Sequence, residues 1–118
     1  LINNARDAMD EEATARRQRG QLYEKRLTID TALVAGRVRL TLTDNGPGIS
    51  AETQQRIFAP FFTTKGVGKG TGLGLSVSYR IIQQYSGVLE VESCQGAGAT
   101  FILRFPPFCE RTALLPPV

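Results

Sequence analysis

Two spacings of apolar side chains run along this chain, one typical of helices and the other typical of strands. Over about the first 19 residues, apolar side chains recur every three or four positions: Ile2, Ala5, Met9 and Ala13. This spacing predicts an amphipathic helix that ends near Gly20. Because the first residue is already apolar and in phase, we expect the chain to begin inside this helix.

Alternation of apolar and polar residues predicts four strands. Two strands are expected early, over residues 23–33 and 37–43, with a hairpin turn at residues 35–36. Two more are expected late, around residues 89–92 and 101–105. Each has one polar face, so one side of the sheet should meet water and helices should cover the other.

Two further helices are expected in that covering layer. Ser50 is a predicted N-cap for a short helix over residues 51–58, and a longer helix follows Gly74 and ends near Gly87. Residues 59–72 contain a proline and several glycines, so we expect a long mobile loop there. The predicted class is α+β, a two-layer sandwich whose mostly antiparallel sheet is covered on one face by helices.

Composition limits the kinds of protein that this chain can be. Its 118 residues are 42% hydrophobic and 21% charged, which is typical of one folded domain and excludes a disordered chain. The apolar stretches are far shorter than the roughly 18 to 20 residues that cross a bilayer, so we expect a soluble domain. The net charge of +3 is too small to indicate a nucleic-acid partner.

Histidine is absent from the sequence, which excludes a Cys/His zinc site and a nucleophile activated by histidine. The two cysteines, Cys94 and Cys109, have no metal-ligand companions nearby in the sequence. We expect both to be reduced thiols in a cytoplasmic compartment rather than a disulfide.

Asp44 is the first candidate for chemistry, because it continues the apolar face of the strand over residues 37–43. Its carboxylate should point under the sheet toward the helices, where it needs a hydrogen-bond donor. Gly46 and Gly48 then leave room for a flat group against the backbone. A second interpretation stays open, in which Asp44 only caps the turn.

Glycine occupies every second position from residue 66 to residue 74, directly before the longer helix. Exposed backbone N–H groups, Thr71, Lys65 and Lys69 are parts from which phosphate sites are built. The spacing matches neither the dinucleotide-binding glycine motif nor the P-loop. A flexible linker between two helices is the alternative.

Asn4 faces away from the apolar stripe of the first helix. Its amide oxygen is the kind of ligand that completes the shell of Mg²⁺ beside phosphate and water. A solvated asparagine near a helix end is the alternative. Three aromatic residues around Pro60 are either anchors for the long loop or residues of the core: Phe58, Phe61 and Phe62.

Five segments, taken in order, resemble the sequence boxes of the ATP-binding catalytic domain of bacterial sensor histidine kinases. This domain belongs to a wider superfamily of gyrase-type, mismatch-repair and chaperone ATPases with the Bergerat-type fold. The segments are residues 1–9 (second half of the asparagine box), 44–49 (first glycine box), 57–65 (phenylalanine box), 70–76 (second glycine box) and 96–101 (glycine-threonine strand). The resemblance covers residues 1–106, and residues 107–118 are expected to form a tail.

The resemblance implies a site for ATP and Mg²⁺. Asp44 would accept a hydrogen bond from the adenine amino group, Gly48 would let the base approach, and Thr100 would support the same pocket through water. Asn4 would hold Mg²⁺, and residues 46–72 would form the nucleotide lid. The phosphates would be engaged by Lys65, Lys69, Thr71, Gly72 and Gly74. The remaining residues implied for the nucleotide site are Asp7, Gly46, Ile49, Phe58, Gly70, Leu73 and Leu75.

In these kinases the γ-phosphoryl group passes to a histidine on a separate dimerisation domain, and a response regulator acts downstream. The resemblance therefore implies a cytoplasmic histidine kinase domain of two-component signal transduction, whose residues only position ATP and Mg²⁺. Two other functions stay open. One is a conformational ATPase like those of gyrases and chaperones, and the other is an interaction module without nucleotide.

The chain departs from the family pattern in two ways. The upstream half of the asparagine box is absent, with a second asparagine one helical turn before Asn4, and no histidine is present to accept a phosphoryl group. We therefore expect a fragment, truncated at its N-terminus, that cannot autophosphorylate alone. The missing elements are also expected to leave apolar surface near Leu1 and Ile2 that promotes self-association.

Overall fold

The computed structural model describes residues 1–60, 62 and 74–107. In chain order, the elements of these residues are α1 (Ile2–Gln18), β1 (Leu27–Val34), β2 (Arg37–Asp44), α2 (Ala51–Gln54), α3 (Gly74–Gln84), β3 (Val88–Ser93) and β4 (Ala99–Phe105). The strands form one sheet in the order β1-β2-β4-β3, and every neighbouring pair is antiparallel. The α+β class expected from the sequence is confirmed.

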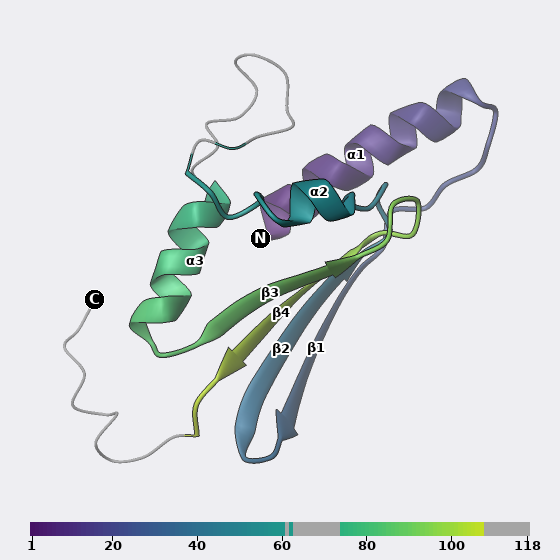
Figure 1. Cartoon of the computed structure of the whole chain (residues 1–118). Coiled ribbons are helices and arrows are strands. Elements are labelled where there is room, and N and C mark those ends of the chain that lie inside the picture. Colours follow the sequence, from purple (N-terminus) through teal and green to yellow (C-terminus); the bar gives the residue numbers. More distant parts are fainter. Residues whose placement is uncertain (61, 63–73, 108–118) are drawn as a thin grey trace.

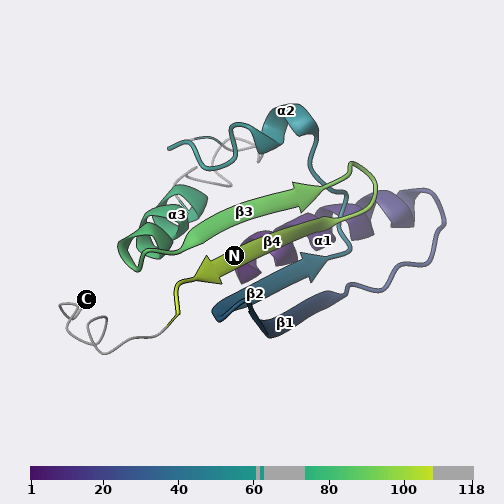
Figure 2. The ribbon, with the colours of Figure 1, turned by 60° about the horizontal axis from the view of Figure 1, so that its bottom comes forward.

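The helices form a layer on one side of this sheet (Figure 1). When the molecule is turned so that the bottom of Figure 1 comes forward, α1 lies behind the strands and α3 beside β3 (Figure 2). The connection from β2 passes through α2 and α3 before the chain returns as β3, so β4 finishes between β2 and β3. The expected two-layer sandwich is therefore confirmed.

The core lies between the helices and the strands β2, β4 and β3. The strand register places Leu42 opposite Phe101 and Leu89 opposite Leu103, so these apolar side chains share the face that meets the helices. All four are buried, and Ile82 of α3 packs against them. Burial of this apolar face against the helices is the main stabilising contribution to such a sandwich.

The segment over residues 51–58 is shorter as a helix than expected. Ser50 is the N-cap, as predicted, and its hydroxyl accepts the N–H of Thr53. The helix α2 ends at Gln54, after which the N–H of Arg56 bonds to the carbonyl of Thr53 three residues earlier. This tighter turn brings Ile57 into the core, where it is 9% exposed.

The buried stripe of α1 differs from the predicted one. Ala5 and Met9 are buried as expected, whereas Ile2 is 56% exposed. Glu12, which was not part of the predicted stripe, is buried at 9% exposure, because the guanidinium of Arg16 one turn later bonds to its carboxylate. An ion pair at this spacing lets a charged side chain lie on the inner face of a helix.

The helices cover only part of the sheet. Strand β1 begins at Leu27, not at residue 23, and its apolar residues Ile29 and Leu33 are 50% and 75% exposed. Val38, opposite Leu33 on β2, is 45% exposed. The hairpin of β1 and β2 projects away from the helical layer (Figure 1). The expectation that helices cover the whole apolar face is wrong for this hairpin.

We predict that the chain self-associates through this uncovered apolar face, because contiguous exposed apolar side chains beside an edge strand attract partners. Leu33→Lys places a charge on that face and should shift the chain toward the monomer. Thr28→Lys, on the opposite polar face of β1, is the matched control and should leave association unchanged. Sedimentation velocity over a dilution series measures both, and a concentration-independent monomer of the unsubstituted chain would contradict the prediction.

Candidate functional site

Asp44 ends strand β2, and its side chain lies on the face that meets the helices. The register pairs it with Ala99 of β4, and the residue is 5% exposed. Its Oδ1 atom accepts the N–H of Gly46 at 2.8 Å. The inward orientation expected from strand parity is confirmed, and the carboxylate also caps the turn. Both interpretations are compatible, because an ionised carboxylate has about four acceptor positions.

Burial shifts the pKa of this carboxyl group. Loss of water raises the pKa of Asp44 above its ordinary value of 3.8, and hydrogen bonds from the backbone N–H groups of Gly46 and Ala99 partly oppose that rise. The ionised form is therefore costly to hold here. A ligand that donates a hydrogen bond to the carboxylate would offset part of that cost.

Gly46 brings α1 close to this carboxylate. A Cβ atom at Gly46 would lie 2.9 Å from Oδ1 of Asp44 and 3.2 Å from the Cβ of Ala8. Glycine at position 46 therefore allows α1 to pack against the turn, whereas a larger residue would push the two apart. Asn4 and Asp7 lie one helical turn and one residue before Ala8, so the helix that carries them packs against the Asp44 turn.

Asn4 and Asp7 are both partly buried on α1. The carboxylate of Asp7 accepts a hydrogen bond from Arg6 at 3.4 Å. Over the described part of the chain, no three His, Cys, Asp or Glu side chains are grouped so as to hold a metal ion. A Mg²⁺ ion held by Asn4 would therefore take most of its ligands from phosphate and water, as such ions commonly do.

The first glycine box, residues 44–49, is fixed against the turn between β3 and β4. Gly48 has φ +77°, and a Cβ atom there would lie 2.3 Å from the carbonyl oxygen of Cys94. The N–H of Gly96 donates to the carbonyl of Pro47 at 2.6 Å, and the N–H of Ile49 donates to Oγ of Ser93. These contacts give a packing reason for glycine at 48, and a role toward an adenine base stays a prediction.

Thr100 is not placed with Asp44. It pairs with Thr43 across β2 and β4, and the hydroxyl oxygens of the two threonines lie 3.0 Å apart on the outer face of the sheet. Ala99 stands opposite Asp44 instead. Since successive residues of a strand point to opposite faces, the prediction that Thr100 supports the same pocket is wrong.

Three predicted site residues take part in the core. The ring of Phe58 stacks on Tyr79 with centroids 5.2 Å apart and meets Phe101 edge-on at 6.5 Å. Leu75 also packs against the core, as does Ile49 beside the turn. Contacts of these residues with a nucleotide are not excluded by this packing and stay predictions.

The phosphate side of the expected site lies outside the described residues. Of the phosphate residues, Gly74 alone is described, and it is the exposed first residue of α3. The predicted positions that lie outside are Phe61, Lys65, Lys69, Gly70, Thr71, Gly72 and Leu73. Of the predicted lid over residues 46–72, positions 61 and 63–72 are outside, as are Cys109 and the tail over residues 108–118, whereas Cys94 is described as an exposed free thiol.

Sequence reasoning missed Tyr23 and Asn45. The Tyr23 hydroxyl lies 2.9 Å from the carbonyl oxygen of Asn45 and 3.0 Å from its side-chain Oδ1. Residue 23 was expected to start a strand, so no contact with the turn was foreseen. The available signal was Asn45 itself, because asparagine at a turn favours side-chain bonds to the backbone.

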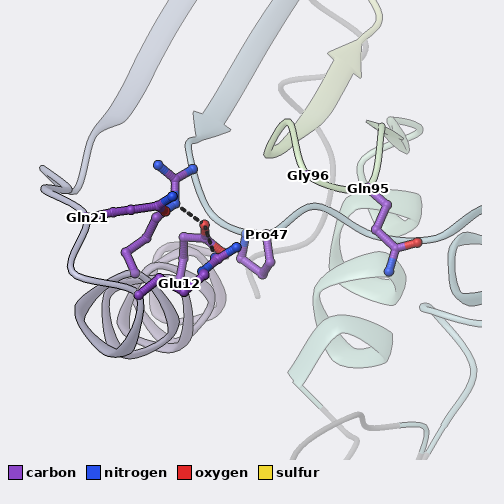
Figure 3. Close-up of a pocket in the computed structure, with 7 residues that line it drawn as sticks. Glu12, Gln21, Pro47, Gln95 and Gly96 are labelled. Atoms are coloured by element: carbon purple, nitrogen blue, oxygen red, sulfur yellow. Dashed lines mark hydrogen bonds and ion pairs between the residues drawn. The ribbon is translucent and has the colours of Figure 1, made fainter.

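A hollow of about 470 Å³ lies beside the glycine box, between the end of α1 and two turns. Figure 3 shows Glu12 and Gln21 on one side of it, Gln95 and Gly96 on the other, and Pro47 between them. The Glu12 carboxylate is 2.6 Å from Nε of Arg16 and 3.9 Å from Nη2 of Arg19. Asp44 does not line this hollow, so the hollow is distinct from the expected base site.

Comparison with known proteins bears on this arrangement. Residues 1–108 match the family described as "Histidine kinase-, DNA gyrase B-, and HSP90-like ATPase", and the chain belongs to that family. The Two-component sensor PprA of Pseudomonas aeruginosa is 44% identical over 106 residues, which cover 90% of this chain and 11% of PprA. The Sensor kinase CckA of Brucella abortus is 43% identical over 120 residues, covering 93% of this chain and 12% of CckA.

Solved structures agree with this membership. A catalytic domain of histidine kinase ThkA superposes with a TM-score of 0.65 at 28% identity, over 89% of this chain and 58% of that chain. Full-length ShkA in complex with AMPPNP gives a TM-score of 0.63 at 31% identity, over 70% of this chain and 17% of ShkA. These neighbours confirm the resemblance to a histidine kinase catalytic domain. No described helix is long and apolar enough to span a membrane.

We predict that Asp44→Asn raises the free energy of unfolding at neutral pH. The folded chain binds the Asp44 proton more tightly than the unfolded chain, so the stability of the native protein falls as pH rises from 3.8 through the raised pKa. Asparagine removes this ionisation. The two proteins should therefore differ most at neutral pH and converge below 3.8.

Urea unfolding across this pH range measures the difference. Asp30→Asn, at an exposed position of β1, is the matched control and should show no such pH-dependent gain. A lower stability of Asp44→Asn at neutral pH would contradict the inferred cost of the buried charge.

Proposed function

We propose that this domain binds ATP with Mg²⁺ and, in the intact protein, donates the γ-phosphoryl group to a histidine on a separate dimerisation domain. A response regulator would then receive the signal, as in two-component transduction. Membership of the family and the AMPPNP named in the ShkA complex support the nucleotide. The sensor kinases among the relatives support the phosphoryl transfer.

The observation that carries the proposal is the buried Asp44 carboxylate at the glycine turn. It lies inside the helix-covered face, its Oδ1 is fixed by the N–H of Gly46, and α1 is in contact with the same turn. A fixed carboxylate at a turn without side chains is suited to accept a hydrogen bond from the exocyclic amino group of adenine. Asp44 would thus orient the nucleotide through its base.

The other residues act by position and charge. Asn4 would present its amide oxygen to Mg²⁺ from α1, and the metal ion would neutralise phosphate charge. The phosphates would lie on the segment that leads into α3, at Lys65, Lys69, Thr71, Gly72 and Gly74. Further contacts with the nucleotide are proposed for Asp7, Gly46, Gly48, Ile49, Phe58, Gly70, Leu73 and Leu75. Phosphoryl transfer needs mainly such positioning and charge neutralisation.

The setting of the domain is also part of the proposal. The chain spans 11% of PprA and 12% of CckA, so the dimerisation domain, the response regulator and the signal belong to a longer protein and its system. We propose that the domain works in the cytoplasm, where ATP and a response regulator are available.

Asp44→Asn should weaken ADP binding in the presence of Mg²⁺. The change replaces a charged acceptor by an amide, and loss of one charge-assisted hydrogen bond lowers affinity roughly tenfold to a hundredfold. Isothermal titration calorimetry measures the dissociation constants of the two proteins, with Asp30→Asn as the control that retains full affinity. Equal ADP affinity of folded Asp44→Asn and the unsubstituted chain would remove the adenine assignment.

Incubated alone with labelled ATP, the chain should acquire no phosphohistidine, because it contains no histidine. Added to a separate dimerisation domain of a related sensor kinase, it should label that domain with an acid-labile phosphoryl group. Asn4→Ala should abolish the labelling through loss of the metal ligand. ADP binding without any transfer to such domains would contradict the kinase part of the proposal and leave nucleotide binding standing.

A further inference from the structure

The side chain of Asn45 is bonded to one short segment that precedes β1. Its Oδ1 accepts the backbone N–H of Arg26 at 2.9 Å, and its Nδ2 donates to the carbonyl of Glu24 at 2.8 Å. Its own N–H donates to the carbonyl of Arg26 at 3.2 Å. The Tyr23 hydroxyl donates to the carbonyl and to Oδ1 of Asn45, sharing its single proton between them. Residues 23–26 therefore hold Asn45 from several directions.

This segment is in turn attached to α1. The guanidinium of Arg16 lies over the ring of Tyr23, 5.4 Å from its centroid, and its Nε bonds to the buried carboxylate of Glu12. The N–H of Gln21 donates to the carbonyl of Arg16 at 2.9 Å. A chain of contacts therefore runs from Glu12 through Arg16 and Tyr23 to Asn45. A cation held over an aromatic ring also fixes the plane of that ring.

The Tyr23 hydroxyl stays a donor at neutral pH. Burial raises the pKa of Tyr23, and the negative charges of Glu12 and Asp44 add to the rise, while Arg16 opposes it. At neutral pH the Tyr23 hydroxyl therefore keeps the proton that it donates to Asn45. This supports the contact seen in the geometry.

Asn45 stands between the two groups that define the base site. Asp44 precedes it, Gly46 follows it, and the bond from the Gly46 N–H to Oδ1 of Asp44 spans it. The backbone angles of Asn45 therefore decide whether that bond forms and where the carboxylate points. The bonds from residues 23–26 restrict these angles from one side, and the Gly96–Pro47 bond restricts the turn from the other.

We propose that Tyr23 is a positioning residue for Asp44, acting through Asn45, and that it sharpens selection of bases with an exocyclic amino group. The inference rests on the proposed function, because Asp44 is taken as the acceptor for that amino group. In this proposal, residues 12–26 connect α1 to the turn at Asp44 and hold that turn in place. Removing one hydroxyl group should then change base discrimination without changing the fold.

The test compares Tyr23→Phe with the unsubstituted chain in titrations with two nucleotides. Phenylalanine keeps the ring beneath Arg16 and removes only the hydroxyl. Loss of this hydrogen bond should weaken ADP binding about fivefold. Purine riboside diphosphate, which lacks the 6-amino group, should bind both proteins equally. Tyr85→Phe, at an exposed tyrosine beyond α3, is the matched control and should bind both nucleotides as the unsubstituted chain does.

Two further measurements separate positioning from a general loss of structure. In an Asp44→Asn background, Tyr23→Phe should cause no additional loss of ADP affinity, because the group that it positions is gone. Hydrogen exchange at the Gly46 amide, measured without nucleotide, should be faster in Tyr23→Phe, because that amide bonds to Asp44.

The outcomes distinguish this inference from the proposed function. Equal losses for ADP and purine riboside diphosphate, or unchanged ADP affinity in Tyr23→Phe, would overturn the positioning role and leave ATP binding intact. If the unsubstituted chain bound no ADP, the proposed function would fail. The exchange measurement would then decide alone, with faster exchange at Gly46 supporting the placement of Asp44 by Tyr23 and unchanged exchange overturning it.

Discussion

The hydrogen bond between the Asp44 carboxylate and the Gly46 amide is the interaction on which the arrangement of this domain depends. It lies at the end of β2, in a position that is 5% exposed, where an ionised group is costly to bury. The surrounding structure lowers that cost with backbone N–H groups from the turn and from β4. It also requires glycine at 46, because α1 lies against the same turn. The carboxylate therefore joins the sheet to the turn, and α1 packs against that turn.

The domain holds the turn around this acceptor from two sides. On one side, the turn between β3 and β4 bonds to Pro47 and Ile49. On the other, the segment before β1 bonds to Asn45 and leads back to the second half of α1. A turn held in this way suits the proposed role of positioning ATP for transfer, since most of the rate gain in phosphoryl transfer comes from placement.

Strand parity and helix spacing were sufficient to predict the sandwich and the inward orientation of Asp44. The role of Thr100 came from the family resemblance, whereas strand parity with the inward Phe101 places residue 100 on the outer face. Glu12 was also missed, since an acidic residue is expected to face water unless a partner one turn away is considered. Tyr23 was missed for a similar reason, as its partner lies 22 residues away. Local patterns determine elements, whereas the contact of Tyr23 with Asn45 is set by tertiary packing.

The central claim is that a nucleotide binds at the Asp44 turn, and backbone amide NMR during titration with ADP and Mg²⁺ tests it most directly. The account predicts that the largest chemical-shift changes fall on the amides of Gly46 and Ala99, which bond to the carboxylate, on Gly48, and on Ala8 of α1, which lies against Gly46. Saturation of these changes at one equivalent of ADP would support a single base site. Absence of changes there, or changes confined to the hollow between Glu12 and Gln95, would contradict the account.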